Sequence, residues 1–314
     1  MSIDVLGSPY EVREIQLPDD EEGKVIATLV KRPSNKQSQK AVLYVHGYCD
    51  YFFQKEMAEK YTDQGFHFYA LDLRKYGRSL LPHQTPNFCK NIEEYYPEMD
   101  RSLDVILNED GNKQVLLNGH STGGLLASLY AHDTRDQNRI SALFLNSPFF
   151  EFNENLLARK VLLELVSAIG TKKPYRKIPG GLSELYGQSV HKDFKGEWSF
   201  NTDWKPIQGF QLRAGWLKAI LDAHKRLHAG LQIPCPILVM FSNQSSWVNE
   251  WDDNLLCSDT ILNVEHISKY ADVLGNHITK VRIENGMHDL ILSAPNVRRV
   301  VYEELFTWLR AYVP

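Results

Sequence analysis

One stretch of the chain, residues 115–132 (VLLNGHSTGGLLASLYAH), constrains the fold more than any other. Its apolar start is typical of the end of a buried strand, and the apolar residues from 125 onward recur at helical spacing. Between them, GHSTG at 119–123 fits G-x-S-x-G, in which a serine lies on a sharp strand-to-helix turn and the glycines avoid clashes. The pattern predicts an exposed Ser121 hydroxyl, although a glycine-rich turn that only caps the helix would have the same composition.

Segments typical of strands alternate with helical segments on both sides of this turn. Continuous apolar strands that alternate with helices predict a mostly parallel sheet with helices on both faces, which is an α/β fold. The predicted strands are residues 24–31, 41–47, 67–74, 115–120, 140–148, 235–242 and 277–284. Between about 150 and 232 there are helical segments but no convincing strand. We therefore predict a core domain, 1–149 and 233–314, interrupted by a helical cap, 150–232.

Composition and charge exclude several classes of protein. A formal net charge of −4 does not give the basic surface of a general nucleic-acid binder. No apolar stretch is long enough to span a bilayer, and the first residues do not resemble a secretory signal. The four cysteines form no C-x-x-C pair, and the histidines form no H-E-x-x-H motif, so neither a metal site nor a disulfide framework is expected. We expect a cytoplasmic protein with no metal, no cofactor and no nucleic-acid partner.

A serine hydroxyl becomes a useful nucleophile when a base removes its proton and a third group orients that base. In one known arrangement these groups follow the order serine, acid, histidine along the chain. Here GMHD at 286–289 places His288 in a loop after a predicted strand, and CSDT at 257–260 places Asp259 between a strand and a helix. Asp259 could instead cap that helix, and three other carboxylates remain alternatives for the acid: Asp252, Asp253 and, less favourably, Asp289.

Acyl transfer also requires backbone N–H groups that bind the developing oxyanion. One donor is the residue after the nucleophile, Thr122, and the other comes from the loop after an earlier strand. HGYCDY at 46–51 fits that loop, because Gly47 permits close approach of the backbone and Tyr48 supplies an N–H group. Cys49 in the same loop has no neighbouring base motif, and we interpret it as a small buried residue.

Five motifs together resemble an α/β-hydrolase of the monoglyceride lipase and serine aminopeptidase S33-like group, over about residues 25–312. They are HGY at 46–48, LDLRKYGRS at 71–79, GHSTGG at 119–124, SDTILNV at 258–264 and GMHD at 286–289. The resemblance implies that Ser121 is the nucleophile, His288 the base and Asp259 the orienting acid. It also implies that the N–H groups of Tyr48 and Thr122 form the oxyanion hole, and that 150–232 covers the site as in uncharacterised bacterial members.

The chain departs from this family at three places. Lys75 stands where a glycine is commoner, and a long segment, SNQSSWVNEWDDNLLC at 242–257, precedes the proposed acid. The oxyanion loop reads HGYCDY rather than the HGxGEH of monoglyceride lipases. Specificity for monoacylglycerol therefore does not follow from the resemblance.

Substrate contacts are harder to predict than the catalytic groups. We expect Tyr48, His120 and Trp216 to contact the substrate; four cap aromatics could line an apolar pocket or form the core of the cap: Trp198, Phe200, Trp204 and Trp216. The apolar segment LLARKVLLELVSAIG at 156–170 is interpreted as a packed cap helix, and transient lipid contact is the alternative. His224 and His228 share one helical face, which we interpret as solvated.

These residues predict a serine hydrolase that cleaves carboxylic esters, including small to medium acyl esters and monoacylglycerol- or lysophospholipid-type substrates, through an acyl-enzyme. An S33-type aminopeptidase or amidase is the alternative, and it would need a carboxylate that binds the substrate ammonium. The candidates for that role are Glu184, Glu197, Glu250, Asp252 and Asp253. A non-catalytic binding protein with this fold is a third possibility, because fold alone does not determine function. The oligomeric state is left open.

Overall fold

The apolar runs form the centre of a mixed sheet in the computed structural model, which describes residues 2–134, 136–153 and 168–313. Within these residues nine strands pair in the order β1-β2-β3-β5-β4-β6-β7-β8-β9. β1 to β3 and the β3–β5 pair are antiparallel, and all pairs from β5 to β9 are parallel. The strands are β1 Ser2–Ile3, β2 Glu11–Asp20, β3 Gly23–Arg32, β4 Lys40–Val45, β5 Phe66–Asp72, β6 Gln114–His120, β7 Ala142–Asn146, β8 Ile237–Ser242 and β9 Ile278–Ile283.

Both faces of the central strands are buried, which explains their continuous apolar sequences. Along β6, Val115 and Leu117 belong to one hydrophobic cluster, whereas Leu116 between them belongs to a second cluster on the other face. Helices α1 and α8 pack on the second cluster, and α2, α3, α6 and α7 pack on the first. The helices are α1 Lys55–Asp63, α2 Tyr96–Asp104, α3 Thr122–Asp133, α5 Glu184–Val190, α6 Ala214–His228, α7 Val264–Ala271 and α8 Pro295–Tyr312.

The predicted strands and their alternation with helices are present, and the mostly parallel sheet is that of the α/β-hydrolase fold. The sequence-based prediction missed β1 and β2. β2 is half-exposed along most of its length and has little apolar periodicity. Eight residue pairs with β3, interrupted by an irregularity between Leu17 and Asp20, rather than burial, make it a strand.

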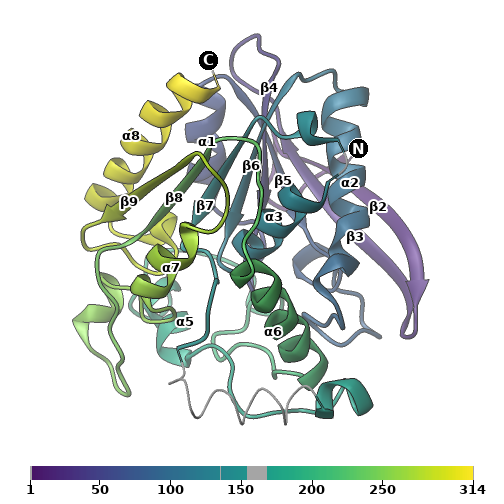
Figure 1. Cartoon of the computed structure of the whole chain (residues 1–314), viewed down its shortest axis with the longest axis vertical. Coiled ribbons are helices and arrows are strands. Elements are labelled where there is room, and N and C mark those ends of the chain that lie inside the picture. The colour runs from purple at the N-terminus through teal and green to yellow at the C-terminus, as the bar shows by residue number, and fades with distance from the viewer. Residues whose placement is uncertain (1, 135, 154–167, 314) are drawn as a thin grey trace.

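The chain between β7 and β8 contributes no strand to the sheet in the part that the structure describes, and it contains α5 and α6. In Figure 1 these helices lie at the lower end of the molecule, opposite the C-terminus. Trp216, Leu217 and Ile220 of α6 belong to the main hydrophobic cluster. Thus α6 packs directly on the core, and the division into core and cap stays an interpretation. Residues 154–167, most of the predicted apolar cap helix, lie outside the described residues.

Three of the four aromatic residues of the predicted cap pack against residues of the 46–53 region. Trp198, Phe200 and Trp204 join Tyr51 and Phe53 in a small hydrophobic cluster. In the part of the chain that the structure describes, no helix is long and apolar enough to cross a bilayer.

Candidate active site

The turn between β6 and α3 holds Ser121 in a conformation that depends on its small neighbours. Ser121 has a φ of 52°, a left-handed value that residues with a side chain rarely adopt. A Cβ atom at Gly119 would lie 2.5 Å from the carbonyl oxygen of Gly123, and one at Gly123 would lie 2.4 Å from that of His46. The glycines of GHSTG are therefore required by close backbone approach, and the turn places Ser121 directly before the first residue of α3.

His288 links Ser121 to Asp259 through one contact at each ring nitrogen. Nε2 of His288 lies 3.1 Å from Oγ of Ser121, and Nδ1 lies 2.9 Å from Oδ2 of Asp259. All three side chains are buried. Because a carboxylate only accepts hydrogen bonds, Nδ1 donates to Asp259, which leaves Nε2 able to accept the serine proton. These three predicted residues are brought together with hydrogen-bond geometry at both links.

The carboxylate of Asp259 is fixed at the end of β8 although a long segment precedes it. The segment leaves the sheet after Ser242 and returns beside its own start: N–H of Asp259 donates to the carbonyl of Gln244 at 3.0 Å. Oδ1 of Asp259 accepts from the N–H groups of Ile261 and Leu262. The cap of α7 is Asn263, so Asp259 does not cap that helix. Asp252 instead caps a separate short helix, Asp253–Leu256, where its side chain accepts from the N–H of Asn254.

His120 and Asp289 lie beside Ser121 and His288. Oδ1 of Asp289 accepts from Nδ2 of Asn146 at 2.7 Å, and Oδ2 lies 3.9 Å from Nε2 of His120. The His120 ring is buried, its Nδ1 lies 3.1 Å from the carbonyl oxygen of Asn146, and burial lowers its pKa. His120 is not among the residues that line the cavity at Ser121. The structure thus places His120 beneath the site rather than in a position to contact substrate.

Tyr48 and Thr122 were predicted to supply the two backbone donors. Among the described residues, the N–H groups of Tyr48 and Thr122 have no protein acceptor. Thr122 begins α3, so its N–H also lies at the positive end of that helix. Both residues line the same cavity as Ser121. The arrangement can bind an oxyanion formed at a carbonyl carbon that Ser121 attacks.

The cavity above Ser121 has a volume of about 350 Å³ and is mainly apolar. Tyr48, Ser121 and Thr122 come from the core, and Trp216, predicted to contact substrate, comes from α6. None of the described lining residues carries a charged side chain, and the carboxylates considered for binding an ammonium group are not among them. The other lining residues are Phe149, Phe152, Asn153, Pro179, Gly180, Gly181, Leu182, Leu212, Leu217, Leu221, Ile261 and Leu262.

Cys49 and the histidines at 224 and 228 lie in packed surroundings. Cys49 is buried, and burial raises the pKa of its thiol to about 11, whereas an activated thiol has a lowered pKa.

The interpretation of His224 and His228 as a solvated face is wrong. His224 is buried with Nε2 2.8 Å from the carbonyl oxygen of Phe149, and His228 stacks on Tyr270 with ring centroids 3.7 Å apart. Phe149 and Tyr270 therefore cover this face of α6.

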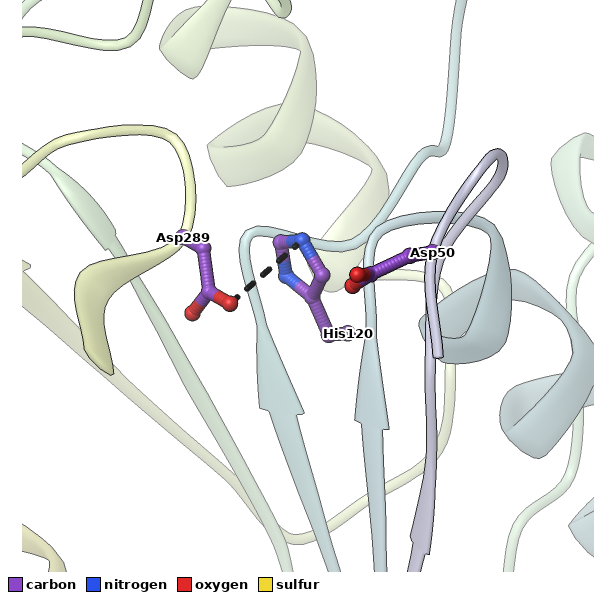
Figure 2. Close-up of side chains that lie close together, drawn as sticks. All are labelled: Asp50, His120 and Asp289. Carbon is purple, nitrogen blue, oxygen red and sulfur yellow. Dashed lines mark ion pairs between the residues drawn. The ribbon is translucent and has the colours of Figure 1, made fainter. Parts of the chain in front are cut away.

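One charged pair near the site was not predicted from the sequence. Asp50 lies in the 46–51 loop, and its Oδ1 lies 2.6 Å from Nζ of Lys205. Figure 2 shows His120 between Asp50 and Asp289, with ligand atoms of the three residues all within 4.8 Å of one another. This is a donor set that a divalent cation would accept. The Lys205 ammonium, however, already supplies a positive charge at Asp50.

Several solved structures share the fold of this protein over nearly its whole chain. The soluble variant of monoglyceride lipase from Saccharomyces cerevisiae, solved with a substrate analogue, superposes with a TM-score of 0.71 at 15% identity and covers 95% of this chain and 94% of its own. The Paleococcus ferrophilus monoacylglycerol lipase gives 0.65 at 16% identity, covering 96% and 99%. A thermostable carboxyl esterase from Bacillus coagulans, bound to glycerol, gives 0.65 at 14%, also covering 96% and 99%.

No curated protein matches the sequence significantly. A protein-family model, Hydrolase_4, described as serine aminopeptidase, S33, matches residues 36–292. That range includes Ser121, Asp259 and His288. The chain belongs to the serine aminopeptidase S33 family and has the α/β-hydrolase fold.

Proposed function

We propose that this protein is a serine hydrolase that cleaves carboxylic esters with apolar acyl groups. One observation carries the proposal: Oγ of Ser121 lies 3.1 Å from Nε2 of His288, which is itself paired with Asp259, on the wall of an apolar cavity. A buried serine hydroxyl held by a histidine and a carboxylate is the arrangement that activates a serine for attack on a carbonyl.

In the proposed reaction Ser121 Oγ attacks the ester carbonyl carbon while its proton passes to Nε2 of His288. Asp259 stabilises the imidazolium that forms, because it accepts a hydrogen bond from Nδ1. The carbonyl oxygen becomes an oxyanion that the N–H groups of Tyr48 and Thr122 bind. Collapse of this intermediate breaks the bond to the alcohol, which leaves with the proton from His288, and an acyl-Ser121 ester remains.

Deacylation repeats these steps with water as the nucleophile. His288 removes a proton from the water as it attacks the acyl carbonyl, and then returns that proton to Oγ as the carboxylic acid leaves. The same two N–H groups bind the second oxyanion. Each proton that His288 accepts is thus given back, and no cofactor is required for the reaction.

The lining of the cavity favours an apolar acyl group. Phe149, Phe152, Trp216 and five leucines surround it, and burial of apolar area is the main source of affinity in such a cavity. Three proteins with the same fold are named as a monoglyceride lipase, a monoacylglycerol lipase and a carboxyl esterase, which supports ester cleavage as the proposed activity.

Aminopeptidase activity is the second candidate, because the family description names it. Binding of an N-terminal ammonium would leave a charge without a partner, since no described lining residue is a carboxylate. The two candidates are separated by comparing p-nitrophenyl esters of increasing chain length with aminoacyl p-nitroanilides. We expect ester hydrolysis with a preference for medium chains; faster cleavage of the anilides would replace the ester proposal with the peptidase.

A further inference from the structure

The loop that supplies the oxyanion donor Tyr48 is held by a segment of the predicted cap, residues 201–210. Tyr48 Oη donates to the carbonyl oxygen of Phe210 at 3.5 Å. Asp50 pairs with Lys205, and Oη of Tyr51 accepts from N–H of Asn201 at 2.7 Å. Three residues of the loop thus each contact the same segment, which lies about 150 residues further along the chain.

The Asp50–Lys205 pair is the strongest and most enclosed of these contacts. The side chains are 3% and 9% exposed, and Nζ of Lys205 also lies 5.4 and 5.6 Å from the ring centroids of Phe53 and Phe200. A buried ion pair adds little net stability, because both charges lose their water. Removal of one partner leaves the other charge buried and unpaired, so the pair instead enforces one geometry.

The loop needs such a constraint, because its backbone is strained. Cys49, between Tyr48 and Asp50, has a φ of 53°. A non-glycine residue keeps a left-handed conformation only where its surroundings force it to. The residues on either side of Cys49 are the two that contact Phe210 and Lys205. The direction of the Tyr48 N–H therefore depends on these contacts.

The carboxylates on either side of His120 also favour the ion pair between Asp50 and Lys205. Asp50 and Asp289 lie on opposite sides of His120, which directly precedes Ser121 (Figure 2). The Lys205 ammonium offsets one of these two buried negative charges. Without it, Asp50 and Asp289 would repel each other across a buried imidazole.

We propose that Lys205 is a positioning residue of this hydrolase: its buried ion pair with Asp50 holds the 47–51 loop so that the Tyr48 N–H is aimed at the substrate oxyanion. The inference rests on the proposed function, and it adds a residue of the cap to the determinants of the oxyanion hole. Lys205 acts through Asp50 and Tyr48 and does not touch the reacting atoms.

The test is Lys205→Met in the full chain, with Lys192→Met, an exposed lysine of the same region, as the matched control. Loss of a whole oxyanion donor costs about 10²–10³ in kcat, so a misdirected donor should lower kcat by about 10- to 100-fold. KM should change by less than about threefold, because the donor acts mainly in the transition state. An alkyl boronic acid, which mimics the tetrahedral intermediate, should bind more weakly by the same factor as kcat falls.

Coupling and rescue separate positioning from a general structural role. Asp50→Asn should lower kcat to the same extent, and the double variant Lys205→Met/Asp50→Asn should be no worse than either single variant. Lys205→Arg should recover most of kcat, because it restores the charge. If Lys205→Met does not fold, Asp50→Asn, which keeps the shape of the side chain, decides the question by the same readouts.

A folded Lys205→Met variant with wild-type kcat, or one whose kcat falls while boronate affinity is unchanged, would overturn the inference. The control Lys192→Met should match the wild type throughout. A wild-type protein that neither hydrolyses esters nor reacts with a fluorophosphonate would instead contradict the proposed function itself. The two failures are therefore distinguishable.

Discussion

The carboxylate of Asp259 joins two networks at once: Oδ2 lies 2.9 Å from Nδ1 of His288, and Oδ1 accepts from the N–H groups of Ile261 and Leu262. The imidazole is thereby held in one orientation and one tautomer. Asp259→Asn should keep the backbone contacts through its amide oxygen but present an N–H donor to Nδ1. We expect kcat for ester hydrolysis to fall by about 10³–10⁴-fold, because the wrong tautomer leaves Nε2 unable to accept the serine proton.

Asp252→Asn is the matched control for this change. Asp252 lies in the same long segment, but it caps a short surface helix rather than contacting His288. Its kcat should remain within about twofold of wild type, because a surface substitution of this kind changes stability little. The assignment of the acid is wrong if Asp252→Asn is inactive and Asp259→Asn retains activity.

The cavity should set the length of the acyl chain. Leu182 lines the cavity and is only partly buried, so a larger side chain there fills the cavity without disturbing the core. Leu182→Trp should shift the preferred p-nitrophenyl ester towards shorter chains and lower kcat/KM for the longer esters by about 10-fold or more, since each excluded CH₂ forfeits about 0.8 kcal/mol of burial. A chain-length series measured on both proteins checks this.

Leu185→Trp provides the comparison, because Leu185 is also partly buried but does not line the cavity. It should leave the chain-length profile as it is in wild type. An identical profile for Leu182→Trp would mean that the acyl group binds elsewhere.

Thiol reagents should not inactivate the enzyme at neutral pH. Burial raises the pKa of Cys49 to about 11, so the reactive thiolate is scarce at every pH below that value and grows only as the pH approaches it. Burial and the carboxylates of Asp252 and Asp253 also raise the pKa of the half-buried Cys257, so this thiol should react slowly, and its modification should not reduce activity. Iodoacetamide at pH 7.5, followed by mass spectrometry and an ester assay, checks both statements. Inactivation that tracks modification of Cys49 would contradict them.

Lys75 combines backbone strain with two ion pairs. Its φ is 65°, and its buried Nζ lies 2.6 Å from carboxylates of both Asp20 and Glu22. Lys75→Ala should lower the free energy of unfolding by about 2–4 kcal/mol, because both carboxylates lose their partner. Lys75→Gly should be less destabilising than Lys75→Ala by about 1 kcal/mol, since glycine tolerates the left-handed backbone. Urea unfolding measures this difference, and equal stabilities would show that the backbone strain is negligible.

The proximity of Ser121, His288 and Asp259 could be predicted from sequence because the local chemistry of each position is contained in adjacent residues. Gly119 and Gly123 permit the turn at Ser121, and the order of the motifs along the chain identifies the other two positions. The long segment before Asp259 did not prevent this. It returns to the end of β8 through backbone hydrogen bonds with Gln244 and Ser246, which the sequence does not reveal.

Contacts between distant segments could not be predicted. Asp50 and Lys205 are 155 residues apart, and neither lies in a pattern that indicates a buried charge. Periodicity showed that His224 and His228 share a helical face, but not which neighbour covers that face. The strand β2 was missed for a related reason: it is stabilised by pairing at the edge of the sheet, and its side chains remain partly exposed.

Reaction with a fluorophosphonate tests the central claim most directly, because the probe labels only a serine that its surroundings activate. The experiment compares wild type with Ser121→Ala and His288→Ala, each shown to be folded by its thermal unfolding transition. The account predicts rapid labelling of the wild type at Ser121 and none of either variant. Labelling that persists in folded Ser121→Ala, or a folded wild type that does not react, would contradict it.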